Sequence, residues 1–294
     1  MDDNQQTSTL RTETIKDIDS QSMTTKKIIL FISSILICSW TIGFCLSYFF
    51  KGSDFDISNI YTFLPAIYTI LWILVHKQSI KDLKWKFKRP WWLYIVAMYF
   101  PLSYIVPEIA IQNLFKYVSY DFPFEKLPVL LTVRVLIGAT IGLGILILGE
   151  EVAWRGYLQD KLVSKLGIHK GLILLGVTWG IWHLPMIINS VNYESDNWVF
   201  DAFVFYPLFC TALSYVIFLI MFKCNSIWIA VFIHASNNNI WHLTGRHSTI
   251  LNKNGSMTVS ILFFIAVIFV CAFILTKYAN RQHRLAKSGA EVGI

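Results

Sequence analysis

Long apolar runs alternate with short polar segments along almost the whole chain. A helix of about 20 apolar residues spans the hydrocarbon layer of a bilayer, and about eight runs approach or exceed this length. They cover residues 28–50, 57–75, 91–111, 128–148, 171–189, 199–222, 227–241 and 257–277. The pattern predicts an all-α, polytopic membrane protein with about eight transmembrane helices.

The seventh run differs from the others. It is short, and it ends in the polar residues Asn237, Asn238, Asn239 and His242. A short span with a polar end usually lines a cavity inside the protein instead of facing lipid. We therefore expect the helices to enclose a polar cavity to which this run contributes.

Composition supports this class of protein and sets the expected domain limits. Hydrophobic residues make up 55% of the 294 residues and charged residues only 15%, whereas soluble domains carry about 25% charge. Residues 1–25 are polar and predict a disordered cytoplasmic tail. A transmembrane domain is expected over residues 26–280, and a basic cytoplasmic tail over residues 281–294. The five cysteines form no CxxC pair and are interpreted as small apolar residues in helices.

The basic residues predict the orientation in the lipid bilayer. The net charge is +7, but the lysines and arginines gather in particular loops, so we expect no nucleic-acid partner. The segments 76–90, 150–170 and 277–294 are basic, whereas 107–127 and 190–198 are poor in bases. Cytoplasmic loops of membrane proteins carry the excess of Lys and Arg. The expected arrangement is an integral protein of the plasma membrane with both termini in the cytoplasm.

Three groups of polar residues interrupt the apolar pattern, and the first follows the fourth run. It reads Glu150-Glu151-Val-Ala-Trp-Arg155. If the helix continues, Glu151 and Arg155 are neighbours at i, i+4 and can pair. Glu150 then points elsewhere and is free to act as a base. Taken alone, the group is equally well interpreted as helix-end charges at the cytoplasmic surface.

The second group is Trp179-Gly-Ile-Trp-His183, and the third is His234-Ala-Ser-Asn-Asn238. In each group a histidine shares a helix face with a residue one turn away. Taken singly, His183 is interpreted as a hydrogen-bonded structural histidine. His234 and Asn238 are likewise interpreted as polar contacts between helices.

Taken together, the three groups suit one kind of chemistry. Glu150 and His183 suffice to activate a water molecule for attack on a carbonyl. His234 and Asn238 supply donors for the resulting oxyanion. Alternatively, Glu150, His183 and His234 form a ligand set that suits Zn²⁺ with an open water position. The residues leave a glutamate-dependent and a zinc-dependent mechanism open.

These groups resemble the motifs of the CPBP family of intramembrane proteases (CAAX protease and bacteriocin-processing, or Abi). The family includes the Ras-converting CAAX endopeptidase, and its pattern is EExxxR, then FxxxH, then HxxxN or HxxxB, where B is Asn or Asp. Here the pattern reads Glu150-Glu151-xxx-Arg155, Trp179-xxx-His183 and His234-xxx-Asn238, in the same order. Trp179 departs from the usual Phe of the family. The similarity covers a core over residues 120–245.

The resemblance implies an all-helical fold with a conical cavity open to the cytosol and to lipid. It implies that Glu150 and His183 activate water. His234 and Asn238 would form the oxyanion hole, with Glu151, Arg155 and Trp179 in support. The implied activity is that of an endopeptidase of the CAAX prenyl protease 2 type, either glutamate- or metal-dependent. The implied substrate is a membrane-associated peptide or protein, such as a prenylated CAAX tail or a bacteriocin-type peptide.

Two other classes of function remain as alternatives. A non-catalytic membrane scaffold or bacteriocin self-immunity protein would bind a peptide without cutting it. Such a protein has no need to keep Glu150, His183, His234 and Asn238 all intact. A secondary transporter with Glu150 and His183 as a proton relay is a third hypothesis. Transporters commonly show repeated halves, and the sequence shows no such repeat.

Overall fold

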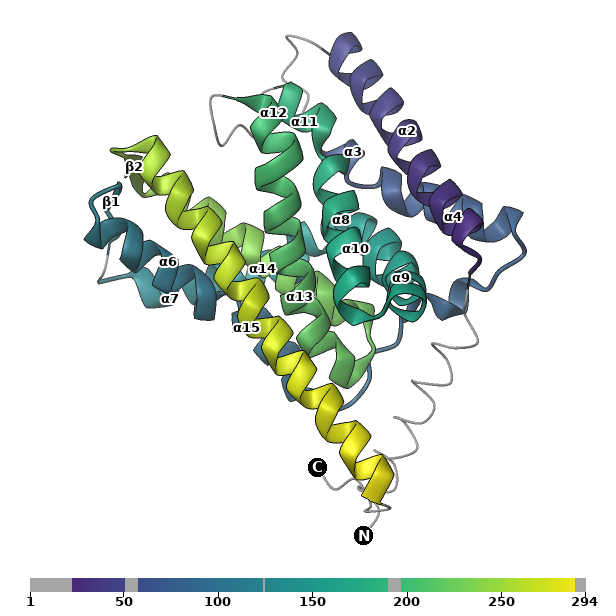
Figure 1. Cartoon of the computed structure of the whole chain (residues 1–294). Coiled ribbons are helices and arrows are strands. Elements are labelled where there is room, and N and C mark those ends of the chain that lie inside the picture. Colours follow the sequence, from purple (N-terminus) through teal and green to yellow (C-terminus); the bar gives the residue numbers. More distant parts are fainter. Residues whose placement is uncertain (1–22, 51–57, 124, 190–196, 289–294) are drawn as a thin grey trace.

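Helices dominate the computed structural model, which describes residues 23–50, 58–123, 125–189 and 197–288 (Figure 1). The all-α prediction is therefore confirmed. One small departure among these residues is an antiparallel pair of strands, β1 (Val118–Tyr120) and β2 (Ser248–Ile250). Of the two predicted tails, residues 1–22 and 289–294 lie outside the described residues. Helix already begins at Thr25 and continues to Ser288.

The helices have the following bounds. They are α2 (Thr25–Phe49), α3 (Ser58–Tyr61), α4 (Leu64–Val75), α5 (Trp92–Tyr99), α6 (Leu102–Leu114), α7 (Leu127–Ile137), α8 (Leu143–Glu151), α9 (Gln159–Leu166), α10 (Ile168–Trp182), α11 (Leu184–Ile188), α12 (Trp198–Phe200), α13 (Tyr206–Cys224), α14 (Ile227–Arg246) and α15 (Lys253–Ser288). Turns of π-helix cover Gly138–Gly142, Val152–Leu158 and Asp201–Phe205, and a 3₁₀ turn covers Ile80–Leu83.

The length and polarity of the helices agree with an integral membrane protein. Five helical stretches of the described residues are long and apolar enough to cross a bilayer. They are Thr25–Phe49, Trp92–Leu114, Ile168–Ile188, Trp198–Cys224 and Lys253–Arg281. Leu64–Val75 and Pro128–Ile137 are apolar but shorter. The expected count of eight is not confirmed. The second and fourth runs form shorter helices, and the seventh forms a continuous helix that contains polar residues.

The fourth run continues as helix beyond its expected end. α8, the π-helical turn Val152–Leu158 and α9 follow one another without a break from Leu143 to Leu166. The expectation of a basic loop over 150–170 is therefore wrong for this part. Arg155 in particular is completely buried and does not face water. Turns of π-helix inside α-helices frequently mark functional sites, and this one carries Arg155.

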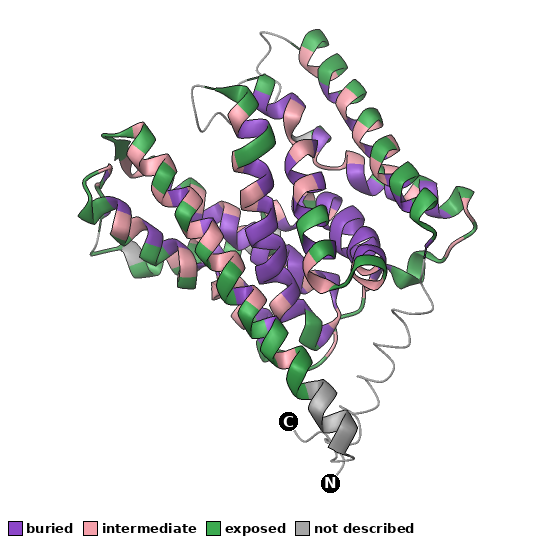
Figure 2. Cartoon of the chain, viewed as in Figure 1, coloured by how far each residue is buried: buried purple, intermediate pink, exposed green. Residues whose placement is uncertain are grey.

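α10 and α13 belong to the centre of the molecule, which other helices cover. In the spans of α10 and α13 61% of the most apolar window is buried, against 28% in α2 and 22% in α15. Figure 2 shows the same contrast between a buried centre and outer helices with exposed faces. Many exposed residues of the outer helices are apolar, as at Ile37, Phe269 and Phe273. Such faces suit contact with lipid tails.

α10 and α13 approach each other through glycines. A Cβ on Gly176 would lie 2.3 Å from the Cα of Thr211, and a Cβ on Gly180 would lie 2.4 Å from the Cα of Pro207. Small residues four positions apart let two membrane helices approach closely. This packing fixes the position of α10, which carries Trp179 and His183.

Gly180→Ala is expected to lower the thermal unfolding midpoint of the detergent-solubilised protein. Its methyl group must displace the backbone at Pro207, and overpacking of this kind costs about 1–3 kcal/mol. Gly245→Ala is the matched control, because a Cβ there meets nothing within 4 Å. Differential scanning fluorimetry compares the two variants. Equal midpoints would contradict the close approach of α10 and α13.

Candidate active site

Three ionisable residues form a buried cluster where α8, the π-helical turn after it and α14 meet. Arg155 Nη1 donates to Glu151 Oε1 at 2.9 Å, and His234 Nδ1 lies 2.8 Å from the same oxygen. Glu151 and Arg155 are completely buried, and His234 is 4% exposed. An ionised carboxylate only accepts hydrogen bonds, so His234 Nδ1 is the donor. The pairing expected from the i, i+4 spacing is confirmed, and Glu151 holds His234 as well.

Arg155 is anchored on two further helices. Its Nη2 donates to Ser214 Oγ of α13 at 3.3 Å. Its guanidinium lies 4.1 Å from the ring centroid of Trp179 on α10, a cation–π contact. A buried charge without partners is costly, whereas a paired and hydrogen-bonded one is tolerated. The side chain thus connects the helix of Glu151 with both central helices.

Glu150 lies at the end of α8 and has a different partner. Trp179 Nε1 donates to Glu150 Oε2 at 2.7 Å. Glu150 is only 4% exposed. The preceding Gly149 packs tightly, because a Cβ there would lie 2.5 Å from the carbonyl oxygen of Thr62. The two adjacent glutamates therefore have separate environments. Glu151 is bonded to Arg155 and His234, and Glu150 is bonded to a neutral indole.

His183 is held in one tautomer by its own helix. Its Nδ1 lies 2.9 Å from the carbonyl oxygen of Trp179. A carbonyl only accepts, so Nδ1 carries the hydrogen and the neutral ring has its lone pair on Nε2. The ring lies edge-to-face with Trp182 and tilted against Tyr206, at centroid distances of 4.9 and 5.2 Å. His183 is partly exposed, so its ring is accessible to a ligand.

Asn238 is the most accessible of three consecutive asparagines. It is partly exposed, whereas Asn237 and Asn239 are 1% and 8% exposed. The neighbours are engaged elsewhere: Tyr104 donates to Asn237 Oδ1 at 2.7 Å, and Asn239 Nδ2 donates to the carbonyl oxygen of Arg134 at 3.4 Å. This arrangement favours Asn238 over its neighbours as the residue that faces a ligand.

The structure gathers Glu150, His183 and His234 around the indole of Trp179, and it shows no contact of Asn238 with this indole among the described residues. The Trp179 ring lies 5.0 Å from the ring of His234 and 6.1 Å from the ring of His183, in addition to its bond with Glu150. Among the described residues no hydrogen bond joins Glu150 to His183, so Trp179 is the residue that both contact. The sequence motif marks Trp179 only as an aromatic position. A tryptophan at this position also brings an N–H donor, which the usual Phe lacks, and this donor forms the bond to Glu150.

The expected zinc ligands do not form a metal site as they stand. Within the described part of the chain, no three side chains of His, Cys, Asp or Glu are gathered closely enough to hold a metal ion. His234 Nδ1 is bonded to Glu151, and His183 Nδ1 is bonded to backbone. In both histidines Nε2 remains for another ligand, since metal-bound histidines commonly donate their second ring N–H in this way. The steps below are carried by the side chains alone.

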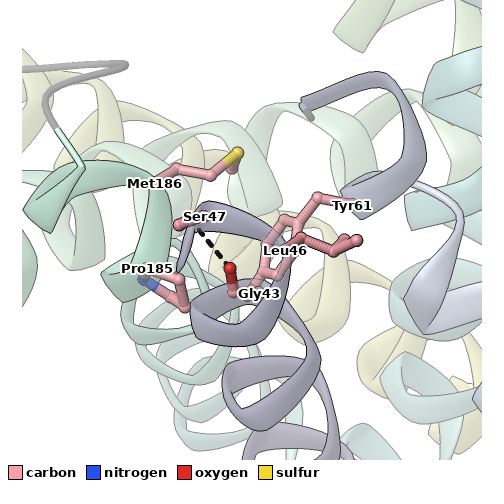
Figure 3. A pocket seen from close by; sticks show the side chains of 6 residues that line it. All are labelled: Gly43, Leu46, Ser47, Tyr61, Pro185 and Met186. Carbon is pink, nitrogen blue, oxygen red and sulfur yellow. Dashed lines mark hydrogen bonds between the residues drawn. The ribbon is translucent and has the colours of Figure 1, made fainter. Parts of the chain in front are cut away.

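A narrow apolar pocket lies beside the site, between α2 and α11 (Figure 3). It is lined by Gly43, Leu46, Ser47, Tyr61, Pro185 and Met186. Ser47 Oγ donates to the carbonyl oxygen of Gly43 at 2.8 Å, and Tyr61 donates to the carbonyl oxygen of Trp182 at 2.8 Å. Pro185 and Met186 follow His183 closely in the chain. The pocket thus adjoins the helix end that bears His183.

Comparison with known proteins finds similarity over the same part of the chain. Residues 126–240 match the family described as type II CAAX prenyl endopeptidase Rce1-like. All seven residues of the three motifs lie in this range. The chain is also 32% identical over 90 residues to the CAAX prenyl protease 2 of Methanococcus maripaludis. This similarity covers 31% of the chain and 29% of the relative's length.

Arg155→Met is expected to destabilise the fold strongly, by about 3–5 kcal/mol, because it leaves the buried Glu151 carboxylate without its guanidinium. The double variant Arg155→Met/Glu151→Gln should recover part of the loss. Lys165→Met, on the exposed face of α9, is the matched control and should have little effect. Thermal unfolding of the three variants tests this. An Arg155→Met midpoint equal to that of Lys165→Met would contradict a stabilising buried pair.

Proposed function

We propose that this chain, whose residues 126–240 match the Rce1-like family of type II CAAX prenyl endopeptidases, is an intramembrane endopeptidase. It hydrolyses a peptide bond in a membrane-associated protein or peptide. The observation that carries the proposal is the separation of the two glutamates. Glu151 is bonded to Arg155 and His234, and Glu150 is hydrogen-bonded only to the Trp179 indole among the described residues.

The first step is the activation of water by Glu150 and His183. Trp179 donates its hydrogen bond to Glu150 Oε2. The other carboxylate oxygen, Oε1, therefore accepts the proton from a water molecule. His183 Nε2 accepts a hydrogen bond from the same water and orients it. The water oxygen attacks the carbonyl carbon of the scissile peptide bond and forms a tetrahedral intermediate. The proton on Glu150 then passes to the leaving amine as the C–N bond breaks, which restores the carboxylate.

The oxyanion of this intermediate is stabilised by His234 and Asn238. His234 Nδ1 is bonded to Glu151, so Nε2 is the nitrogen that faces the substrate. In this role Nε2 donates to the oxyanion while Nδ1 donates to the Glu151 carboxylate. Asn238 adds an amide donor from the same helix face, one turn away. Donors placed where negative charge develops are among the largest contributions to catalysis.

The substrate and the location of the protein follow from the family and from the charges. A prenylated CAAX-type tail is the first candidate substrate, because the curated relative is a CAAX prenyl protease 2. A bacteriocin-type peptide is the second. The basic segments 76–90 and 277–294 support a cytoplasmic position for both termini and for the site, in the plasma membrane. The protease core over residues 120–245 lies within the membrane domain 26–280.

The test is cleavage of a fluorogenic farnesylated CAAX peptide by the purified protein. Glu150→Gln should lose at least about 10³-fold in rate, because its amide cannot accept the proton from water. Glu125→Gln, which changes an exposed glutamate, is the matched control and should cleave like the wild type.

Each result has one meaning. Full activity of Glu150→Gln would contradict the proposed base. Cleavage by the wild type and by Glu125→Gln alone would support it. Failure of the wild type to cut this peptide would remove the prenylated substrate and direct the assay to bacteriocin-type peptides. Zinc is measured in the same samples, and stoichiometric zinc together with loss of activity on chelation would overturn the metal-free mechanism.

A further inference from the structure

We infer that Tyr104 and Asn237 position the amide of Asn238 for the oxyanion, a role that rests on the proposed peptidase function. Tyr104 lies on α6, outside the residues that match the family. Its hydroxyl donates to Asn237 Oδ1 at 2.7 Å, and Asn237 Nδ2 donates to Asn238 Oδ1 at 3.2 Å. Two hydrogen bonds thus run from α6 to the proposed oxyanion donor on α14.

The direction of these bonds sets which end of Asn238 faces the substrate. An asparagine amide presents an oxygen at one end and an N–H₂ group at the other, and rotation by half a turn exchanges them. An oxygen turned toward an oxyanion would repel it. Because Asn238 Oδ1 accepts from Asn237, the opposite end, Nδ2, remains for the substrate. A reversed Asn238 would set two N–H₂ groups against each other.

The Tyr104 hydroxyl fixes the first amide of this chain. A phenol is a better donor than acceptor, because its oxygen lone pair is delocalised into the ring. Its hydrogen therefore selects the oxygen end of Asn237, and the N–H₂ end of Asn237 then selects the oxygen end of Asn238. Asn237 is 1% exposed, so water is a poor substitute for this hydroxyl. The Tyr104 hydroxyl thus fixes the orientation of the Asn237 amide, and Asn237 fixes the orientation of the Asn238 amide.

The Tyr104 ring is held firmly enough to act as the anchor. It lines a small apolar pocket with Phe209 and Leu213 of α13 and Phe264 of α15. Its ring also lies 6.4 Å from that of Phe100, at the C-terminal end of α5. The hydroxyl is thus directed at Asn237 from a ring packed between three helices. Tyr104 is a positioning residue, since it acts through Asn238.

The test is a double-mutant cycle with the farnesylated CAAX peptide and the full-length protein. Tyr104→Phe removes only the hydroxyl. We expect it to lower kcat about tenfold with KM nearly unchanged, since an oxyanion contact acts in the transition state. In an Asn238→Ala background the same change should have no further effect. Tyr68→Phe is the matched control, because it removes an interhelical hydroxyl contact, with Ser34 at 2.5 Å, away from the site.

The outcomes separate this inference from the proposed function. Absence of cleavage by the wild type overturns the function itself. If the wild type cleaves, an unchanged kcat in Tyr104→Phe overturns the positioning role. A loss that is the same in the presence and absence of Asn238 also overturns it, because a structural defect would be additive. If Tyr104→Phe does not fold, the cycle is run with Asn237→Ala, and additive effects there overturn the inference.

Discussion

The buried bond between Glu151 and Arg155 is the constraint on which the rest of the site depends. Two opposite charges in an apolar interior are tolerated much better when they are paired and hydrogen-bonded. Arg155 is bonded to Glu151 and Ser214 and lies over the face of Trp179. Glu151 Oε1 accepts from both Arg155 and His234. The pair thereby connects α8, α10, α13 and α14, and it orients the histidine that faces the proposed substrate.

The same bond determines what remains for Glu150. Because Arg155 and His234 are bonded to Glu151, the adjacent carboxylate keeps only the neutral Trp179 indole as a hydrogen-bond partner among the described residues. The single tautomer of His183 is set independently by the carbonyl oxygen of Trp179. Tight packing at Gly149 and Gly180 holds the two helices that carry these groups. The account of catalysis therefore assigns one glutamate to proton transfer and the other to structure.

Local spacing in the sequence predicts those contacts that lie within one helix. The long apolar runs predict the helical membrane fold, and the i, i+4 spacing predicts the bond of Glu151 to Arg155. Hydropathy alone fails where charge is buried, so Arg155 is misplaced in a cytoplasmic loop. Contacts between helices are not visible in a single sequence, because they depend on how the helices pack. The bonds of Trp179 to Glu150, His234 to Glu151 and Tyr104 to Asn237 are of this kind.

The division between the two glutamates is tested most directly by the thermal unfolding of Glu150→Gln and Glu151→Gln, measured side by side in detergent. Glu151→Gln leaves Arg155 and His234 without their shared counter-charge, so its midpoint should fall by several degrees. Glu150→Gln keeps an oxygen acceptor for Trp179 and relieves a buried charge, so its midpoint should equal or exceed that of the wild type. A midpoint that falls as far in Glu150→Gln as in Glu151→Gln would contradict the account.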